Sequence, residues 1–325
     1  MPDRNEVQQI STPTLVSNLY PPEDATMQSP NRKHDRESFF KYMSAATAAI
    51  VLQNRSLRWS SPLLFNDPFD VPRELSFGIV PEDIVQALTR RMANLIEHPP
   101  EDTSQLEPKV RLIVEVVKKA TSPTLKAELL AGLEESATTH RPTGQSMDDL
   151  RTMWRDLIPQ FRILCLTESP AHTAMWYHYA DKYRGVVLEF LCDDALDSAW
   201  LAAKPVAYPS QKPAVYTADG WAQLLTTHNA LAIENLLDVL TYTKAPDWSY
   251  ENEWRITSFK RPSDTGHFTD YTFHSRELKS IYLGPDISSS DREAIISLAT
   301  RFPVASLWDV SIGIDREFAI TAVVG

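Results

Sequence analysis

The sequence is poor in glycine, and this excludes several large classes of nucleotide-binding fold. Only 9 of the 325 residues are glycine, which is roughly 3% of the chain against the ~7% typical of proteins. They are too far apart to form a G-x-G-x-x-G turn, a phosphate-binding P-loop or the G-x-S-x-G turn of α/β-hydrolases. We therefore do not expect a Rossmann dehydrogenase, a P-loop NTPase, a protein kinase or an α/β-hydrolase.

Charge and hydrophobicity indicate an acidic globular protein. With 43% hydrophobic residues the chain can build a core, and its 32 basic and 43 acidic residues give a net charge of −11. This charge argues against duplex nucleic acid or an anionic membrane as the main partner. No apolar run reaches the ~18 residues of a membrane helix, and the start of the chain lacks the pattern of a signal peptide. Cys165 and Cys192 lie in apolar segments, as buried free thiols do in a reducing compartment. We expect a cytoplasmic protein.

The hydrophobic pattern predicts an α+β fold, with a body built on a mixed or mainly antiparallel sheet and with helical insertions. Residues 1–36 are polar and proline-containing, which predicts a flexible tail before a single domain at 37–325. Helical periodicity runs from about 81 to 157 and predicts a helical insertion. Strands are expected at about 39–42, 57–60, 161–166, 185–191 (pairing near 161–166), 252–259, 269–274, 278–283 and 317–324. Further helices are expected at about 44–54, 169–182 and 291–301, the last capped by Ser290. Residues 221–242 are expected to form a second helix-rich stretch.

Two glutamates and an arginine form the sharpest candidate site. In an extended strand, Glu251, Glu253 and Arg255 would lie on one face, with the two carboxylates about 7 Å apart. Such a pair drives its two pKa values apart, as acid–base catalysis requires. The alternative is a solvated strand face with an ion pair that contributes little.

Three further segments offer weaker signals. On a helix, Trp176 and Tyr179 share a face that could stack against a flat ring, although most aromatic stripes belong to a core. The turn around Pro68 places Asn66, Asp67 and Asp70 where they could bind a cation or a ribose hydroxyl, or simply bond their own backbone. The remaining candidates are Lys41 and Tyr42 at the end of the first strand and Thr167 at a junction between strand and helix.

In combination, these segments resemble a bacterial protein family of unknown function. That family has a lysine–tyrosine strand, an F-N-D-P-F-D box, an S-F-S strand, M-W-x-H-Y-A and W-x-Y-E-x-E-W-R. The matching segments are Lys41-Tyr42, Phe65 to Asp70, Met175 to Ala180 with Gly185 downstream, and Trp248 to Arg255 with Lys244 upstream. Cys165-Leu166-Thr167 stands in place of S-F-S. The resemblance covers about residues 38–285 and implies no activity.

A second, looser resemblance is to ADP-ribosyltransferases. These enzymes present a basic or aromatic residue, then small hydroxyls, then a glutamate or E-x-E, and Lys41-Tyr42, Thr167 and Glu251-x-Glu253 follow that order. The resemblance implies that NAD is bound as a substrate and that its nicotinamide–ribose bond is cleaved through an oxocarbenium-like state. Glu253 would stabilise that cation and Glu251 would activate an acceptor that the sequence leaves unknown.

The remaining roles that this resemblance implies concern nucleotide binding. Tyr42 or Tyr179 would stack on the leaving ring, Thr167 would steady the ribose, and Lys41 would take the place of the usual arginine or histidine. We also count Trp176, Arg255 and the Asn66–Asp70 turn among the residues expected around the nucleotide. No metal is part of this interpretation.

Two alternatives remain open. Asp67, Asp70, Glu251 and Glu253 could instead bind a metal ion in a nuclease or phosphodiesterase, which requires them to converge around one cation. The chain could also be a non-catalytic interaction or regulatory module, with Glu253 salt-bridged on a solvated face and no pocket joining the motifs.

Overall fold

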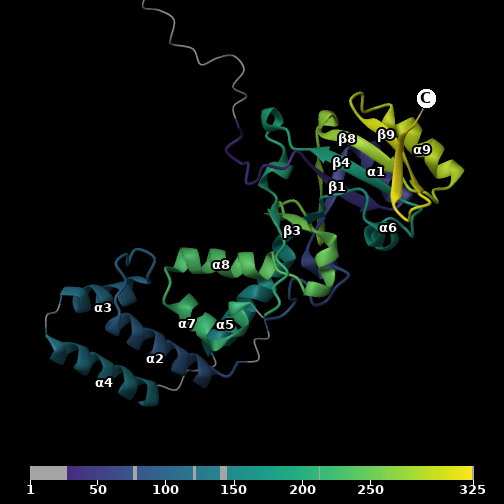
Figure 1. Ribbon diagram of the computed structural model, residues 1–325. Helices are drawn as coiled ribbons and strands as arrows, with labels where there is room; N and C mark the ends of the chain where they lie inside the picture. The colour runs from purple at the N-terminus through teal and green to yellow at the C-terminus, as the bar shows by residue number, and fades with distance from the viewer. Residues whose placement is uncertain (1–27, 76–78, 120–121, 140–144, 212, 324–325) are drawn as a thin grey trace, which may run out of the picture.

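The strands form two five-stranded sheets in the computed structural model, which describes residues 28–75, 79–119, 122–139, 145–211 and 213–323 (Figure 1). Sheet I has the order β1 (Ser38–Met43), β4 (Val186–Leu191), β8 (Leu278–Leu283), β9 (Ser306–Ile312), β10 (Phe318–Ala322). Sheet II has the order β5 (Lys204–Pro205), β6 (Trp254–Phe259), β3 (Phe161–Leu166), β2 (Ser56–Ser60), β7 (Phe268–Thr272). Only β8 and β9 pair in parallel among these strands, so the predicted α+β fold with mainly antiparallel sheets is confirmed.

The two sheets meet where β1 passes the end of β3. Phe40 and Thr167 exchange two backbone hydrogen bonds of 2.9 Å each, so a strand of sheet I is joined to the segment that leaves sheet II. The strand at 185–191 was expected to pair near 161–166, and this is wrong, because β4 pairs with β1 and β8 of sheet I. The bridge places Lys41 and Tyr42 beside the end of β3, where the candidate site lies.

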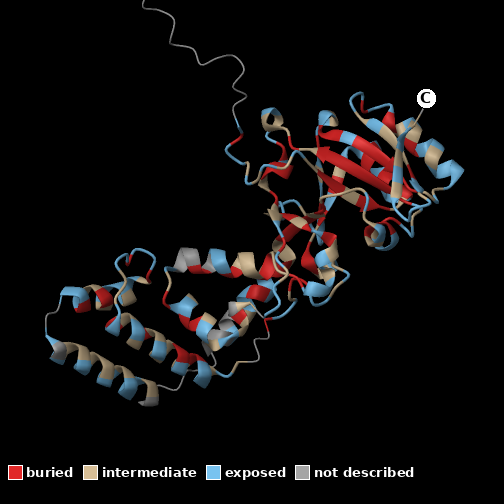
Figure 2. Cartoon of the chain, viewed as in Figure 1, coloured by how far each residue is buried: buried red, intermediate tan, exposed pale blue. Residues whose placement is uncertain are grey.

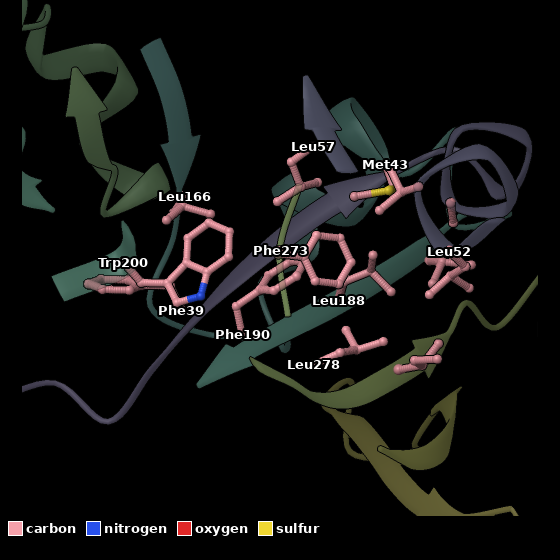
Figure 3. Packing of buried hydrophobic residues seen from close by; sticks show 14 of the residues in the cluster. Phe39, Met43, Leu52, Leu57, Leu166, Leu188, Phe190, Trp200, Phe273 and Leu278 are labelled. Atoms are coloured by element: carbon pink, nitrogen blue, oxygen red, sulfur yellow. The ribbon is translucent and has the colours of Figure 1, made fainter. Parts of the chain in front are cut away.

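The main hydrophobic core fills the space beside sheet I. Phe39, Leu188 and Phe190 from this sheet pack with Leu57 and Phe273 from the segments next to it (Figure 3). Helix α1 (Ala45–Asn54) packs against α9 (Ser289–Ala299) and contributes Leu52 to the same core. Buried residues are concentrated in β1, β4 and β8 of this sheet (Figure 2). This core thus holds β1, the strand of sheet I that carries Lys41 and Tyr42.

Most of the remaining helices form a lobe built from two segments of the chain, whose core also includes Phe161 and Ile163 of β3. Helices α2 (Pro81–Glu97), α3 (Pro108–Lys119), α4 (Pro123–Thr139) and α5 (Gln145–Leu157) lie within the predicted insertion, and α7 (Ala218–Leu225) packs on α2, with α8 (Asn229–Thr241) beside it (Figure 1). The apolar faces of these helices bury Trp154, Trp221 and Leu236 in a second core. No helix of the described chain combines the length and apolar character needed to cross a bilayer.

Two predicted boundaries differ from the structure. Residues 28–36, the described end of the predicted tail, are held in place: Arg32 pairs with Asp194 at 2.6 Å and the Lys33 amide donates to the Leu201 carbonyl. Residues 1–27 lie outside the described part. Helix α6 (Thr173–Tyr179) is shorter than the expected 169–182, since Asp181, Lys182 and Tyr183 adopt positive φ angles, which an α-helix cannot continue through.

Glycine is required at the two positions next to the adjacent ends of β4 and β8, Gly185 and Gly284. A Cβ at Gly284 would lie 2.3 Å from the Tyr183 carbonyl oxygen, and one at Gly185 would lie 2.2 Å from that of Met43. Both positions therefore need the smallest residue for close backbone approach. This explains why the few glycines of the chain include the one that follows the M-W-x-H-Y-A box.

The cap of α9 provides a stability test. Ser288, and not the expected Ser290, accepts a hydrogen bond from the Asp291 amide at 3.1 Å. Ser288→Ala should therefore lower the free energy of unfolding by about 1 kcal/mol, and the matched control Ser290→Ala by less than half of that. Urea denaturation of both variants measures the difference, and an equal loss in both would contradict the assignment of the cap.

Candidate active site

A cavity of about 270 Å³ opens between the two sheets and gathers most of the candidate residues. Its walls come from β1, β2, β3, the turn at 65–70, α6 and the segment from 244 to 253. Nine of the eleven candidates line it: Lys41, Tyr42, Asn66, Asp67, Asp70, Thr167, Tyr179, Glu251 and Glu253. Segments that are far apart in the sequence thus share one hollow.

Trp176 and Arg255 do not line the cavity. Trp176 is fully buried in the core, its Nε1 donates to the Pro170 carbonyl, and its ring meets the edge of Tyr42. The core interpretation therefore holds for Trp176, and its expected stacking on a ligand is not supported by its position. Arg255 lies behind Glu253 and acts through it.

We had expected one continuous strand to carry the two glutamates, and this expectation is wrong. Glu251 ends the 3₁₀-helix η6 (Pro246–Glu251), Asn252 has a left-handed φ of 42°, and β6 begins only at Trp254. Strand alternation therefore does not explain how Glu251, Glu253 and Arg255 come together. The turn at Asn252 directs them inward, and their exposed fractions are 3%, 5% and 0%. The alternative of a solvated face is wrong.

Lys244 and Arg255 bind three carboxyl groups in a buried network. Arg255 donates from Nε to Glu253 Oε1 at 2.7 Å and from Nη2 to Asp70 Oδ2 at 2.7 Å. The Lys244 ammonium donates to Glu251 Oε2 at 2.6 Å and to Glu253 Oε2 at 3.1 Å, and it lies 3.7 Å from Asp70 Oδ2. A buried charge without a partner is strongly destabilising. The network therefore fixes both glutamates against the cavity wall.

The charges of this network do not balance when every group is ionised. Two cations face three carboxylates, so the net charge is 2 − 3 = −1. A single proton on one carboxyl group would make the network neutral. In a buried network the proton binds to the carboxyl whose ionised form is least stabilised by neighbouring charges and hydrogen bonds.

The environment separates the pKa values of the two glutamates. Burial alone would raise the pKa of Glu253, but the charge and hydrogen bonds of Arg255, with Lys244, outweigh it and lower this pKa to about 2. For Glu251, burial dominates over the opposing effects of Lys244 and Tyr179, and its pKa is raised. Glu251 is thus the member of the pair able to exchange a proton, while Glu253 stays ionised.

The hydroxyl groups around the pair hold the backbone and side chain of Glu251. Tyr179 donates its hydroxyl to Glu251 Oε1 at 2.5 Å, and Thr167 donates Oγ1 to the Glu251 carbonyl at 2.6 Å. Burial, followed by the charge of Glu251, raises the pKa of Tyr179, so this hydroxyl remains a donor. The Tyr42 hydroxyl donates to the Ser169 carbonyl and accepts from the His172 amide. Tyr42 therefore offers the cavity only its ring.

The two aspartates of the 65–70 turn have different roles. Asp67 accepts from the Phe69 amide at 2.8 Å, as expected of a side chain that stabilises its own turn. Asp70, at the end of the same turn, is buried and bonds to Arg255. One end of the box therefore shapes the loop and the other anchors it to the charged network.

The donor set does not favour a metal ion. Asp70, Glu251 and Glu253 do converge, but the ammonium of Lys244 occupies the position between their oxygens. Within the described residues, no group of three histidine, cysteine, aspartate or glutamate side chains has metal-binding geometry. This arrangement uses a fixed ammonium where a nuclease would need a hard cation.

Several lining residues were not among the candidates. Arg58, which is paired with Asp270, adds a cation to the wall beside the candidate Lys41, whose ammonium donates to the Cys165 carbonyl at 2.7 Å. Phe65 and Trp248 add rings, and Lys244 lies 4.8 Å from the Trp248 ring. Lys244 had a signal in the sequence, because it stands upstream of the W-x-Y-E-x-E-W-R box. Arg58 had none.

Residues 175–256 match the model of DUF2971, a family of proteins of unknown function. The matched segment begins in α6 and ends in β6, so it contains Tyr179, Lys244 and both glutamates. This confirms the resemblance to a family of unknown function that the sequence motifs indicate. No curated protein matches the chain, and neither does any solved structure.

Because the pKa of Glu253 is lowered in the folded state, we expect the free energy of unfolding to fall at acidic pH. A carboxyl whose pKa is depressed in the folded state stabilises the fold above its ordinary pKa, and this contribution is lost as the pH falls from about 5 towards 2. Wild-type protein should therefore lose unfolding free energy over this range more steeply than Glu253→Gln. Denaturant titrations from pH 7 to pH 2.5 measure the slopes, with near-UV circular dichroism as the control for the fold at pH 7. Equal slopes would refute the assignment.

Proposed function

We propose that the cavity binds a nicotinamide nucleotide such as NAD and cleaves its nicotinamide–ribose bond, with transfer of the ADP-ribosyl group to water or another acceptor. The observation that carries this proposal is the pair of buried glutamates with opposite pKa shifts in one cavity wall. The looser resemblance to ADP-ribosyltransferases supports the same chemistry. The proposal concerns reaction type, and the acceptor stays open.

The reaction places particular demands on the carboxyl groups. When the bond between ribose C1′ and the ring nitrogen breaks, nicotinamide leaves with the bonding pair as a neutral molecule, so no proton donor is needed. The ribosyl group becomes an oxocarbenium-like cation. The acceptor oxygen then forms a bond to C1′ and gives up its proton. The site must therefore stabilise a positive charge and accept one proton.

The charged network meets both demands. With Glu251 ionised, the network carries a net −1 beside the cavity, and a fixed negative charge in a buried site stabilises a developing cation. Glu253 stays ionised and holds Lys244 and Arg255. Glu251, whose pKa is raised, then accepts the proton of the acceptor, after which the network is neutral.

The rest of the wall suits the other parts of the nucleotide. The rings of Phe65 and Trp248 offer flat apolar surface to the nicotinamide. Lys41 and Arg58 place two cations on the wall for the diphosphate. A volume of about 270 Å³ is just below the ~300–1,000 Å³ of ligand sites, so we expect the cavity to receive only the nicotinamide–ribose half.

Incubation with NAD tests the proposal directly. We expect the wild-type protein to release nicotinamide, measured by chromatography, and Glu251→Gln to reduce the rate at least 100-fold, because it removes the proton acceptor. Glu189→Gln is the matched control: Glu189 is also buried and bonds to Ser38 and Tyr282, but it lies in β4 away from the cavity lining. This variant should keep at least a third of the wild-type rate.

The pH profile gives an independent check. Since Glu251 must be ionised to accept a proton, kcat should rise with pH through an apparent pKa above the ~4.3 of an ordinary glutamate. Folded wild-type protein that releases no nicotinamide, or a Glu251→Gln variant as active as the wild type, would overturn the proposal.

A further inference from the structure

The two carboxylate oxygens of Glu251 accept hydrogen bonds from donors of different kinds. Oε1 accepts from the Tyr179 hydroxyl at 2.5 Å, and Oε2 accepts from the Lys244 ammonium at 2.6 Å. An ammonium can only donate hydrogen bonds, whereas a tyrosine hydroxyl can both donate and accept. The two oxygens are therefore not equivalent as positions for a proton.

A proton on Glu251 keeps all of its contacts only if it binds to Oε1. On Oε2 the proton would face the hydrogens of Lys244, which cannot accept it, and that bond would be lost. On Oε1 it faces the oxygen of Tyr179, which accepts it once the hydroxyl turns its own hydrogen away. Glu251 is 3% exposed, so water has little access to replace a lost partner.

Tyr179 is the only hydroxyl hydrogen-bonded to the Glu251 carboxylate among the described residues. The other ionisable groups near this carboxylate are Lys244, Arg255, Glu253, Asp70, Tyr208 and Tyr250. Lys244 and Arg255 are cations without an acceptor. Glu253 and Asp70 are bound by Arg255, and the Tyr208 hydroxyl accepts from the Glu253 amide.

The ring of Tyr179 is held while its hydroxyl remains able to turn. Tyr179 is the last residue of α6, and its ring packs against a buried cluster that includes Tyr42, Met175 and Trp176. Rotation about the bond between the ring and the hydroxyl oxygen needs no movement of this ring. Tyr179 is partly exposed and lines the cavity, so we expect water or a ligand there to accept the hydroxyl hydrogen after it turns.

We propose that Tyr179 is the positioning residue for Glu251: its hydroxyl donates to the ionised carboxylate and accepts from the protonated carboxyl, so that the proton is held on Oε1. The use of this bond in catalysis rests on the proposed function. There, nicotinamide leaves with the electron pair of its bond to ribose C1′, the acceptor oxygen bonds to C1′, and the proton of that oxygen ends on Glu251 Oε1. The hydrogen bond itself can be measured without NAD.

Titration of Glu251 by carboxyl ¹³C NMR tests the bond to the ionised form. The signal of Glu251 is identified by its absence in Glu251→Gln. Tyr179→Phe keeps the ring and should raise the measured pKa by about 1 unit, because the ionised carboxylate loses a charge-assisted donor that is stronger than the bond of the neutral form. Tyr282→Phe is the matched control, since it removes a hydroxyl that donates to the buried Glu189 at 3.0 Å, away from the cavity lining. An unchanged pKa in Tyr179→Phe, or an equal rise in Tyr282→Phe, would overturn the proposal.

Infrared spectroscopy tests where the proton is held. The C=O stretching band of protonated Glu251 should move to higher frequency in Tyr179→Phe, because its O–H loses the acceptor, and should stay in place in Tyr282→Phe. A band that does not move in Tyr179→Phe would place the proton away from Oε1 and refute the inference.

The pH profile of nicotinamide release separates positioning from a general defect. In Tyr179→Phe, kcat should fall about tenfold below the apparent pKa of Glu251 and approach the wild-type value above it, with KM changed less than about twofold. A loss of kcat that is equal at every pH would contradict the role of Tyr179. If wild-type protein releases no nicotinamide, the proposed function fails, whereas the titration and the infrared band still decide the assignment of Tyr179.

Discussion

The candidate site depends on the guanidinium of Arg255, which is completely buried and binds two carboxylates from distant parts of the chain. Through Glu253 it orders the segment that carries both glutamates, and through Asp70 it anchors the turn at 65–70. A bidentate arginine suits this position because its fork fixes direction as well as charge. Among the described residues, removing it would leave Glu253 and Asp70 buried with Lys244 as their remaining cationic partner, and the loss of one member of a buried pair costs about 3–5 kcal/mol.

The excess of one carboxyl group gives the network a second property. A fully matched set of charges would be stable but would have no reason to exchange a proton. Here the carboxyl whose pKa is raised is Glu251, which Lys244 and Tyr179 hold at the cavity wall. Burial thus does two things at once, because it strengthens the ion pairs of Glu253 and raises the pKa of Glu251.

Most elements could be predicted from the sequence, because periodicity and caps are local. The strand at 161–166 and the helices within 81–157 are examples. What failed depends on distant contacts or on single dihedral angles. The short β5 and the strand β9 were missed, since an edge position and a parallel neighbour leave no local mark. The order of the motifs along the chain was enough to name most of the site residues. Their geometry, however, depends on the left-handed backbone of Asn252, and Arg58 reaches the cavity only because β2 lies beside β3. No local sequence pattern predicts that backbone angle or that pairing of strands.

The helical lobe has a consequence for how this chain can vary. Its core joins residues from α5 with residues from α7 and α8, although the strands β3, β4 and β5 separate them along the sequence. A shortened chain without residues 81–157 would leave Trp221 and Leu236 facing water. The two segments therefore depend on each other, and they also support the site, because Phe161 and Ile163 of β3 share this core and Arg255 donates a hydrogen bond to the carbonyl of Thr241 at the end of α8.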